Sequence, residues 1–281
     1  MPGTLYLCAT PIGNLEDITL RVLRILKEVD LIAAEDTRNS IKLLNHFEIK
    51  TPMTSYHEFN KTEKGPVLIE QLKEGRNIAL ITDAGTPAIS DPGELLVQMA
   101  IEAGITVTSL PGACACINAL TLSGLATRRF CFEAFLPADK KERRRILDLL
   151  KDETRTIIIY EAPHRLKNTL AELFETLGDR RINICRELTK KHETCMFTTL
   201  SQSIAYFDEN EPRGEFVLVT EGRSFEELDL DESEKWQQLT IEEHMQVYLD
   251  RGLDKKAAMK AVAKDRKVSK QDIYKQLLRD I

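Results

Sequence analysis

The sequence lacks any apolar run that approaches the roughly 20 residues needed to cross a membrane. Its first apolar stretch, Leu5–Ala9, is too short for the core of a secretion signal, and no basic segment precedes it. Internal repeats and low-complexity tracts are missing as well. We therefore expect Leu5–Ala9 to be a first strand, in a globular protein that has no membrane partner.

Metal-binding and disulfide patterns are also missing. The six cysteines form no C-x-x-C pair, and no histidine cluster stands near them at zinc spacing. Free cysteine is among the most buried residue types, so reduced, buried thiols are the simplest interpretation. Because reduced thiols are typical of the cytosol, the sequence predicts a cytoplasmic protein without a metal site.

Charge is distributed unevenly along the 281 residues, although the net charge is only -6. Residues 208–243 hold thirteen acidic residues against three basic ones, whereas residues 251–281 hold ten basic residues against four acidic ones. This asymmetry indicates that the tail, rather than the whole protein, meets a polyanion.

Short apolar runs alternate with helical periodicity in the first half of the chain. The predicted strands are Leu5–Ala9, Leu31–Glu35, Ile78–Thr82 and Val107–Leu110. Helices are predicted after a Thr19 N-cap, around Ile41–Leu44, over Leu95–Ala103 and over Ala113–Leu122. This alternation is typical of a mostly parallel sheet covered by helices, and it predicts an α/β domain over residues 1–125.

A second block of strands follows with fewer helices. We expect strands at Phe130–Phe135, Thr156–Tyr160, Ile182–Cys185, Met196–Thr199 and Phe216–Val219. Only two substantial helices are predicted between them, at about Lys140–Lys151 and His164–Leu177. The low share of helices favours a mixed sheet in a second α/β domain, over residues 126–224.

The tail is predicted to be a small basic helical domain over residues 238–281, reached through an acidic linking segment at Phe225–Glu234. Helical patterns cover Ile241–Leu249, Asp254–Lys264 and Ser269–Leu278, and Ser269 with Asp272 forms a capping box. With Lys270 and Lys275 on exposed positions, the pattern resembles a helix-turn-helix that contacts nucleic acid. A solvated helical hairpin is an equally good interpretation.

Glycine and proline gather where the predicted strands of the first domain end. These segments are Thr10–Leu15, Glu35–Arg38, Asp83–Gly93 and Pro111–Ala113. In open α/β sheets the carboxyl ends of the strands line the ligand crevice. Four unusual loops at one edge therefore predict a ligand site.

The segment Asp83–Gly93 has features suited to such a site. Gly85 lets the main chain approach a ligand, and Asp91 before Pro92 predicts a helix start with free N–H groups for a carboxylate. The Asp83 carboxylate suits an ammonium or ribose hydroxyls. The segment does not end in Gly-Lys-Ser/Thr, so it is not a P-loop. No G-x-G-x-x-G follows the first strand, which argues against a standard dinucleotide or Rossmann-type methyl-donor site.

Several segments together resemble the tetrapyrrole methylase superfamily, and more narrowly its branch of small-subunit ribosomal RNA methyltransferases. They are Ala9-Thr-Pro-Ile-Gly-Asn-Leu15, Glu35-Asp-Thr-Arg38, Asp83-Ala-Gly-Thr-Pro-Ala-Ile-Ser-Asp-Pro-Gly93, Pro111-Gly112-Ala113, Phe135-Leu-Pro137, Tyr160-Glu-Ala-Pro-His-Arg165, Arg186-Glu-Leu-Thr-Lys190 and Arg213-Gly-Glu215. The resemblance covers nearly the whole chain. One departure is the cysteine pair Cys114 and Cys116, where small residues such as serine are commoner.

The resemblance implies two α/β domains with the donor cleft between them, and a small C-terminal helical domain. It implies methyl transfer from S-adenosylmethionine to the ribose 2′-oxygen of a cytidine in 16S rRNA of the 30S ribosomal subunit, by a homodimer. The positions implied to bind the donor are Pro11, Asp83, Gly85, Ala88, Ile89, Asp91, Gly112 and Ala113.

A positioned base would help to deprotonate the ribose hydroxyl, and Glu35, Asp36 and Lys190 are the candidates. The alternative for Asp36 is a helix-capping turn with a local ion pair. The candidate RNA contacts are Arg38, Lys140, Lys141, Arg143, Arg144, Arg165, Arg186, Lys270 and Lys275. A solvated helix face is the ordinary interpretation of the run at 140–145.

Two other functions fit the same donor loops. A methylase of a corrinoid-type macrocycle would share the donor fold, but it predicts an apolar acceptor trough and no basic tail. The second alternative is a non-catalytic ribosome-binding protein that holds the donor only as a ligand. The basic run at 140–145 and the basic tail favour RNA over a macrocycle.

Overall fold

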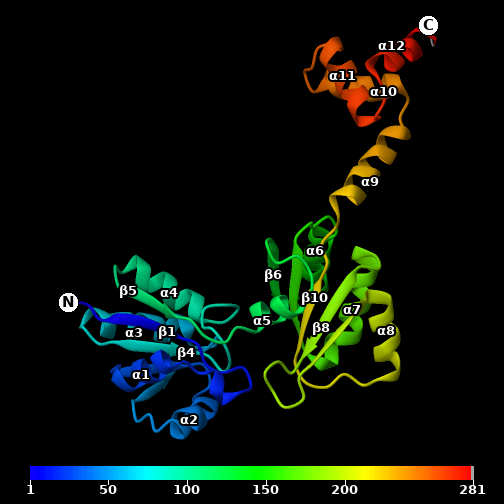
Figure 1. Ribbon diagram of the computed structural model, residues 1–281. Helices are drawn as coiled ribbons and strands as arrows, with labels where there is room; N and C mark the ends of the chain where they lie inside the picture. Colours follow the sequence, from blue (N-terminus) through cyan, green and yellow to red (C-terminus); the bar gives the residue numbers. More distant parts are fainter. Residues whose placement is uncertain (280–281) are drawn as a thin grey trace. The chain divides into compact units, whose positions relative to one another are not determined.

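A computed structural model describes residues 1–279, and within this range the chain forms two compact units (Figure 1). The first unit comprises Met1–Asp148 with Arg155–Glu221 and holds two five-stranded sheets. The second comprises Leu149–Thr154 with Gly222–Ile281, of which residues 280–281 lie outside the described range. The domain boundaries predicted within the first unit stay a prediction.

The first sheet is entirely parallel, with the strand order β3-β2-β4-β1-β5, as the β-α alternation predicts. Its strands are β1 (Thr4–Cys8), β2 (Leu31–Ala34), β3 (Met53–Ser55), β4 (Ile78–Ile81) and β5 (Thr106–Leu110). Side chains alternate between the two faces. Leu5 and Leu7 of β1 belong to one buried cluster, whereas Cys8 belongs to the other.

The helices between these strands are α1 (Leu20–Glu28), α2 (Thr37–His46), α3 (Lys61–Lys73) and α4 (Gly93–Glu102), with a 3-10 turn at Leu15–Asp17. The predicted Thr19 cap is confirmed, since its hydroxyl accepts a hydrogen bond from the N–H of Val22 at 3.2 Å. No element is predicted for β3 and α3. Gly65 and Pro66 stand inside α3, and these residues ordinarily argue against a helix.

The second sheet is mixed, as predicted, with the order β6-β7-β10-β8-β9. Its strands are β6 (Phe130–Phe135), β7 (Thr156–Glu161), β8 (Arg181–Arg186), β9 (Thr194–Thr199) and β10 (Phe216–Thr220), and only β6 and β7 are parallel. The helices here are α5 (Ala115–Leu122), α6 (Lys140–Leu150), α7 (Pro163–Leu177) and α8 (Leu200–Glu209).

Two helices of this half differ from the expectation. Helix α8 was not predicted, since the sequence indicates only two substantial helices between these strands. Helix α5 follows β5 in sequence, but its buried residues Cys116, Ala119 and Leu120 pack with residues of the second sheet such as Ile158 and Val217. The chain therefore leaves the first sheet in the loop between β5 and α5.

The second unit contains α9 (Phe225–Gln237), α10 (Ile241–Asp250), α11 (Lys255–Asp265) and α12 (Lys270–Arg279). The acidic segment expected to link the domains is therefore helical, as α9. The capping box at Ser269 and Asp272 is confirmed by reciprocal hydrogen bonds of 3.2 and 3.3 Å.

Helices α10, α11 and α12 share one apolar core, which includes Met245, Val262 and Ile273. Beside it, the ring of Trp236 stacks on the buried His244, with 4.0 Å between the ring centroids.

No helix in the described part of the chain is long and apolar enough to span a bilayer.

Candidate functional site

The loops after β1 and β4 are joined where the parallel strands end. Thr10 and Gly85 exchange both main-chain hydrogen bonds, at 2.9 and 3.0 Å. Gly85 has φ +85°, and a Cβ there would lie 3.3 Å from the side chain of Ile12. The position therefore requires glycine, for its positive φ and for the close approach of the neighbouring loop.

The loop from Asp83 to Gly93 is held in an unusual conformation by one of its own carboxylates. Ala88 and Ser90 both have positive φ, at 67° and 64°. Asp91 accepts hydrogen bonds from the N–H groups of Ala88, Ile89 and Gly93, at 3.0, 3.1 and 2.7 Å. The left-handed residues are thus held by hydrogen bonds within the loop itself.

This network corrects the expected role of the loop as a helix start with free N–H groups. Helix α4 begins at Gly93, later than the Pro92 start predicted from Asp91. The Asp91 carboxylate already satisfies N–H groups that were expected to await a ligand carboxylate. Asp91 therefore shapes the loop, and its contact with a donor stays a prediction.

A cavity of about 480 Å³ opens beside this loop, within the first unit. Its walls come from the loops of the first sheet and from residues of the second sheet. They are Ile12, Ala84, Gly85, Thr86, Ile89, Cys114, Ala115, Phe135, Tyr160, Glu161, Ala162, Pro163, Leu188, Glu215, Phe216 and Val217. The size is typical of a small-molecule site, with a mostly apolar wall and a few polar groups.

Two of the predicted donor residues, Gly85 and Ile89, line the cavity directly. The other six are not wall residues. Pro11 and Ala113 adjoin the wall residues Ile12 and Cys114, and Asp83 adjoins Ala84. Gly112 packs closely against Ala9, since a Cβ there would lie 2.6 Å from the Ala9 Cβ.

The part of the cavity wall that comes from the second sheet was not predicted from the sequence. Its residues Phe135, Tyr160, Glu161 and Glu215 belong to segments that carry the family resemblance. Strand periodicity alone does not show that these strand ends face a cavity, because that depends on how two sheets of different topology meet.

Three carboxylates lie together at the ends of β2 and β4. Asp83 accepts hydrogen bonds from the N–H of Asp36 at 3.2 Å and from the amide of Asn39 at 3.3 Å. The N–H of Asp83 donates to the Glu35 carboxylate at 3.4 Å. Burial raises the pKa of the Glu35 carboxyl; the N–H of Asp83 opposes this rise, and the charges of Asp83 and Asp91 add to it.

Asp36 is a helix cap with a local ion pair, as the alternative interpretation of this residue expects. It caps α2, accepting from the N–H of Arg38 at 2.8 Å, and its carboxylate pairs with the Arg38 guanidinium at 2.7 Å. Hydrogen bonds from Arg38 lower the pKa of Asp36 to about 2. A carboxylate this acidic is a weak base.

Lys190 is held as a cation. Its ammonium donates to Glu215 at 2.7 Å and to Glu187 at 2.9 Å. Burial lowers the pKa of Lys190, but these two hydrogen bonds outweigh it, and the pKa lies above its ordinary value. A base must be unprotonated, so this arrangement disfavours Lys190 as the base and leaves Glu35 as the better candidate.

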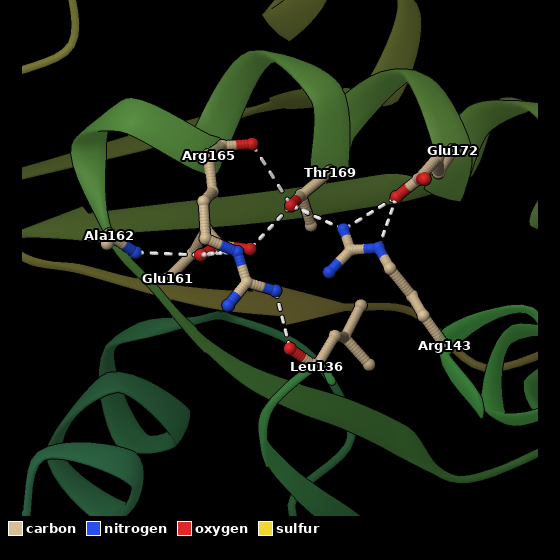
Figure 2. A network of polar contacts seen from close by, with 7 residues as sticks. All are labelled: Leu136, Arg143, Glu161, Ala162, Arg165, Thr169 and Glu172. Atoms are coloured by element: carbon tan, nitrogen blue, oxygen red, sulfur yellow. Dashed lines mark hydrogen bonds and ion pairs between the residues drawn. The ribbon is translucent and has the colours of Figure 1, made fainter. Parts of the chain in front are cut away.

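A buried polar network lies behind the cavity wall at Glu161, and Figure 2 shows its members converging from β7, α6 and α7. The Glu161 carboxylate accepts from the N–H of Ala162 at 2.8 Å and from the Thr169 hydroxyl at 2.5 Å. Arg165 lies 3.5 Å from Glu161 and donates to the Leu136 carbonyl at 2.5 Å. This arginine joins the loop after β6 to the start of α7.

The network also removes Arg143 from the set of candidate RNA contacts. Its guanidinium donates to Glu172 at 2.6 Å and to Thr169 at 2.8 Å, and the residue is only 8% exposed. A phosphate cannot reach a guanidinium enclosed in this way without breaking the network. The prediction of Arg143 as an RNA contact is therefore not supported by its surroundings.

The remaining candidate cations of the first unit differ in their surroundings. Lys140 and Lys141 are exposed at the start of α6. Arg144 pairs with Asp148 and Glu175, at 3.2 and 3.7 Å. Arg186 donates to the carbonyl of Arg213 at 2.7 Å.

Lys270 and Lys275 lie on a basic groove of the helical unit. The groove, of about 810 Å³, is lined by Lys255, Lys256, Met259, Lys270, Gln271, Tyr274 and Lys275, from α11 and α12. Tyr274 is 54% exposed. Four lysines around an exposed aromatic ring are suited to a phosphate backbone with a base stacked on the ring. Lys255 and Lys256, the helix-start lysines that complete this groove, are not among the contacts predicted from the sequence.

Comparison with known proteins supports the family resemblance over most of the chain. Residues 4–203 match the family model of tetrapyrrole (corrin/porphyrin) methylases. A ribosomal RNA small subunit methyltransferase I from Halalkalibacterium halodurans is 52% identical over 272 residues, covering 97% of this chain and 93% of the relative. The protein of that name from Bacillus subtilis is 50% identical, with the same two coverages.

Solved structures share the fold at low sequence identity. A uroporphyrin-III C-methyltransferase from Thermus thermophilus, complexed with S-adenosyl homocysteine, matches with a TM-score of 0.55 and 18% identity over 77% of this chain and 97% of that one. A diphthine synthase matches with a TM-score of 0.59 and 15% identity, over 78% and 90%. The chain thus belongs to the tetrapyrrole methylase family, in its branch of ribosomal RNA small subunit methyltransferases I.

Proposed function

We propose that the protein transfers a methyl group from S-adenosylmethionine to the ribose 2′-oxygen of a cytidine in the 16S rRNA of the small ribosomal subunit. The observation that carries the proposal is the cavity beside Gly85 and Ile89, in a chain about half identical to ribosomal RNA methyltransferases over almost its full length. The basic groove on α11 and α12 supports RNA rather than a macrocycle as the acceptor.

The residues around the cavity fit this donor. The apolar wall formed by Ile12, Leu188 and Val217 suits an adenine ring, and the cavity's volume suits a nucleoside-sized ligand. The carboxylate of Asp83, beside the wall residue Ala84, would stabilise the donor's positive charges. When bound, the donor supplies a methyl group on a cationic sulfur.

The protein's own contribution is positioning and removal of one proton. We assign the base to Glu35, because its pKa is raised whereas Asp36 is a strongly acidic cap. A carboxylate with a raised pKa holds a proton better at neutral pH than an ordinary one. The loop fixed by Asp91 is already ordered, which reduces the entropy cost of binding the donor.

RNA would be held by cations that remain accessible. Lys140 and Lys141 at the start of α6, together with the four lysines of the basic groove, are the proposed phosphate contacts. Arg38, 88% exposed at its side chain, is a further candidate.

The test is methyl transfer from radiolabelled S-adenosylmethionine to 30S subunits, naked 16S rRNA or a precorrin, followed by nuclease digestion to nucleosides. We expect label in 2′-O-methylcytidine. Label on a base, or on the precorrin alone, would contradict the proposal. Glu35→Gln should lower kcat by roughly 100-fold while leaving donor affinity within about threefold, as expected for loss of a general base. Asp36→Asn is the matched control.

We also propose a homodimer acting in the cytoplasm. The exposed Phe197 lies on β9, the edge strand of the second sheet, and is 64% exposed, which suits an interface between copies. A ribosomal substrate and cysteines that form no disulfide support the cytoplasm. Sedimentation equilibrium of the protein and of Phe197→Asp would test the dimer. A monomer at micromolar concentration would contradict it.

A further inference from the structure

Two cysteines stand at the beginning of α5, beside the cavity. Cys114 precedes the helix and lines the cavity wall, whereas Cys116 lies in the first turn and is buried. Their sulfur atoms are 3.4 Å apart, close enough for one thiol to donate a hydrogen bond to the other. Cys114 is therefore not an isolated thiol, because a second sulfur lies within hydrogen-bond distance of it.

The surroundings favour a thiolate at Cys114 and a thiol at Cys116. The hydrogen bond from Cys116 lowers the pKa of Cys114 to about 6; burial opposes this, and the N–H groups of Ile117 and Cys116 assist it. The hydrogen bond to Cys114 and burial raise the pKa of Cys116. One proton is thus shared by the pair and stays on the buried sulfur.

We propose that Cys114 is a covalent modification site for hydroperoxides, with Cys116 as the resolving thiol. The Cys114 thiolate attacks one oxygen of the hydroperoxide, the O–O bond breaks, and the leaving alkoxide takes a proton to become an alcohol. Cys116 then attacks the oxidised sulfur, an S–S bond forms, and hydroxide leaves with the Cys116 proton as water. Two thiols are oxidised by two electrons, and the hydroperoxide is reduced.

A second cysteine pair in the same chain serves as an internal reference. Cys185 and Cys195 lie directly opposite each other on β8 and β9, with their sulfur atoms 3.5 Å apart. Burial raises the pKa of Cys185. This pair has nearly the same spacing between sulfurs, but it lies on strands rather than at the start of a helix. If the position at the helix start, and not the spacing alone, makes Cys114 reactive, the two pairs should differ.

The first experiment follows alkylation of the full-length protein by iodoacetamide as a function of pH, with each cysteine peptide quantified by mass spectrometry. The midpoint for Cys114 should lie near pH 6, and at pH 6.5 Cys114 should react faster than Cys195. In Cys116→Ala the midpoint should rise toward the roughly 8.5 of a free thiol, whereas Cys116→Ser keeps a donor and should retain a low midpoint.

The second experiment treats the donor-free protein with hydrogen peroxide or an alkyl hydroperoxide. The peptide containing both cysteines should lose two hydrogen atoms, and dithiothreitol should restore them. In Cys116→Ala a sulfenic acid at Cys114 should be trapped by dimedone instead. An ordinary midpoint for Cys114 in the unmodified chain, or oxidation of Cys185 and Cys195 before this pair, would overturn the proposal.

A consequence for the donor rests on the proposed function, because it assumes that the donor occupies this cavity. S-adenosyl homocysteine should then shield Cys114 from iodoacetamide, and the oxidised protein should bind it more weakly. If the thiol chemistry is observed but shielding is not, the donor assignment fails while the modification site stands. If Cys114 has an ordinary midpoint, the modification site fails whatever the donor does.

Discussion

Two sets of basic side chains differ in whether the protein itself binds them. One set is Arg143 of α6 and Arg165 of α7, and the other is the four lysines of the basic groove on α11 and α12. Arg143 and Arg165 are bound by acidic side chains, a hydroxyl and a carbonyl of the protein itself. Lys255, Lys256, Lys270 and Lys275 surround a groove instead. The arginines therefore stabilise the fold, whereas the lysines are available to a polyanion. Substitutions in one set should leave the role of the other set unchanged, so the two roles can be tested separately.

The largest effect is expected in the basic groove. Replacing Lys255, Lys256, Lys270 and Lys275 by alanine should weaken binding of 16S rRNA roughly 100-fold at low salt and reduce the slope of log K against log salt by about 3, since each phosphate contact contributes about 0.7–0.9. Binding of S-adenosyl homocysteine should not change. Filter binding over a salt series measures the first effect, and calorimetry the second.

Lys260 and Lys264 provide the matched control, because they are exposed on α11 but do not line the groove. The double alanine variant should retain most of the affinity. If the double variant loses as much affinity per lysine as the quadruple variant, the helical unit contributes only its net charge, and the contrast between the groove and the rest of the surface is wrong.

Arg143→Ala should have the next largest effect, on stability. Removing a guanidinium that is 8% exposed leaves Glu172 and Thr169 without their donor. Because Glu172 is partly exposed, we expect the free energy of unfolding to fall by about 2 kcal/mol, less than for a fully buried pair. Urea unfolding followed by circular dichroism measures this.

Arg144→Ala on the same helix is the control, and it should cost no more than about 0.5 kcal/mol, since its ion pairs are exposed. A salt slope for RNA binding that drops in Arg143→Ala with stability unchanged would show that Arg143 contacts phosphate after all.

Arg165→Gln should distinguish a positioning role from a phosphate contact. The arginine holds the Leu136 carbonyl and lies beside Glu161 in the cavity wall (Figure 2), so its loss should lower kcat roughly tenfold through a misplaced wall. The KM for RNA and its salt dependence should stay as they are. Arg165→Lys should recover part of kcat. A change confined to KM and to the salt slope would assign Arg165 to the RNA instead.

The smallest effect concerns pH and the helical unit. Burial lowers the pKa of His244, the Arg266 charge assists, and the hydrogen bond to Asp265 opposes this. The folded pKa lies below the unfolded value of about 6.5, so the unfolded state binds more protons in acid. Stability is complete above pH 6.5 and is lost as pH falls through the folded pKa. Calorimetry should show a lower Tm at pH 5.5 than at 7.5, and a smaller decrease in His244→Gln.

The sequence predicts the strands and their end loops well, because period and glycine-proline placement are local properties. It fails where local signals conflict with the tertiary structure, as in α3 with its internal Pro66. Most of the cavity wall also escapes prediction. Gly85 and Ile89 are found from one loop, but Tyr160 and Glu161 reach the same cavity from a second sheet.

Whether a charged side chain is accessible is the property that the sequence predicts least well. Arg143 and Lys141 are two positions apart in one basic run, yet only Arg143 is enclosed. Its partners Thr169 and Glu172 are on another helix, 26 and 29 residues away in sequence. A cation's availability depends on such distant partners, so the run at 140–145 predicts a basic surface without showing which of its members belong to it.

The single tryptophan gives the molecule an internal optical label. Trp236 lies in the helical unit, stacked face to face on His244, and none of the residues of either sheet is a tryptophan. Intrinsic indole emission therefore reports on one of the two units only, without an added dye. Because a protonated imidazole quenches indole emission more strongly than a neutral one, the same signal would follow the charge of His244 in the intact chain.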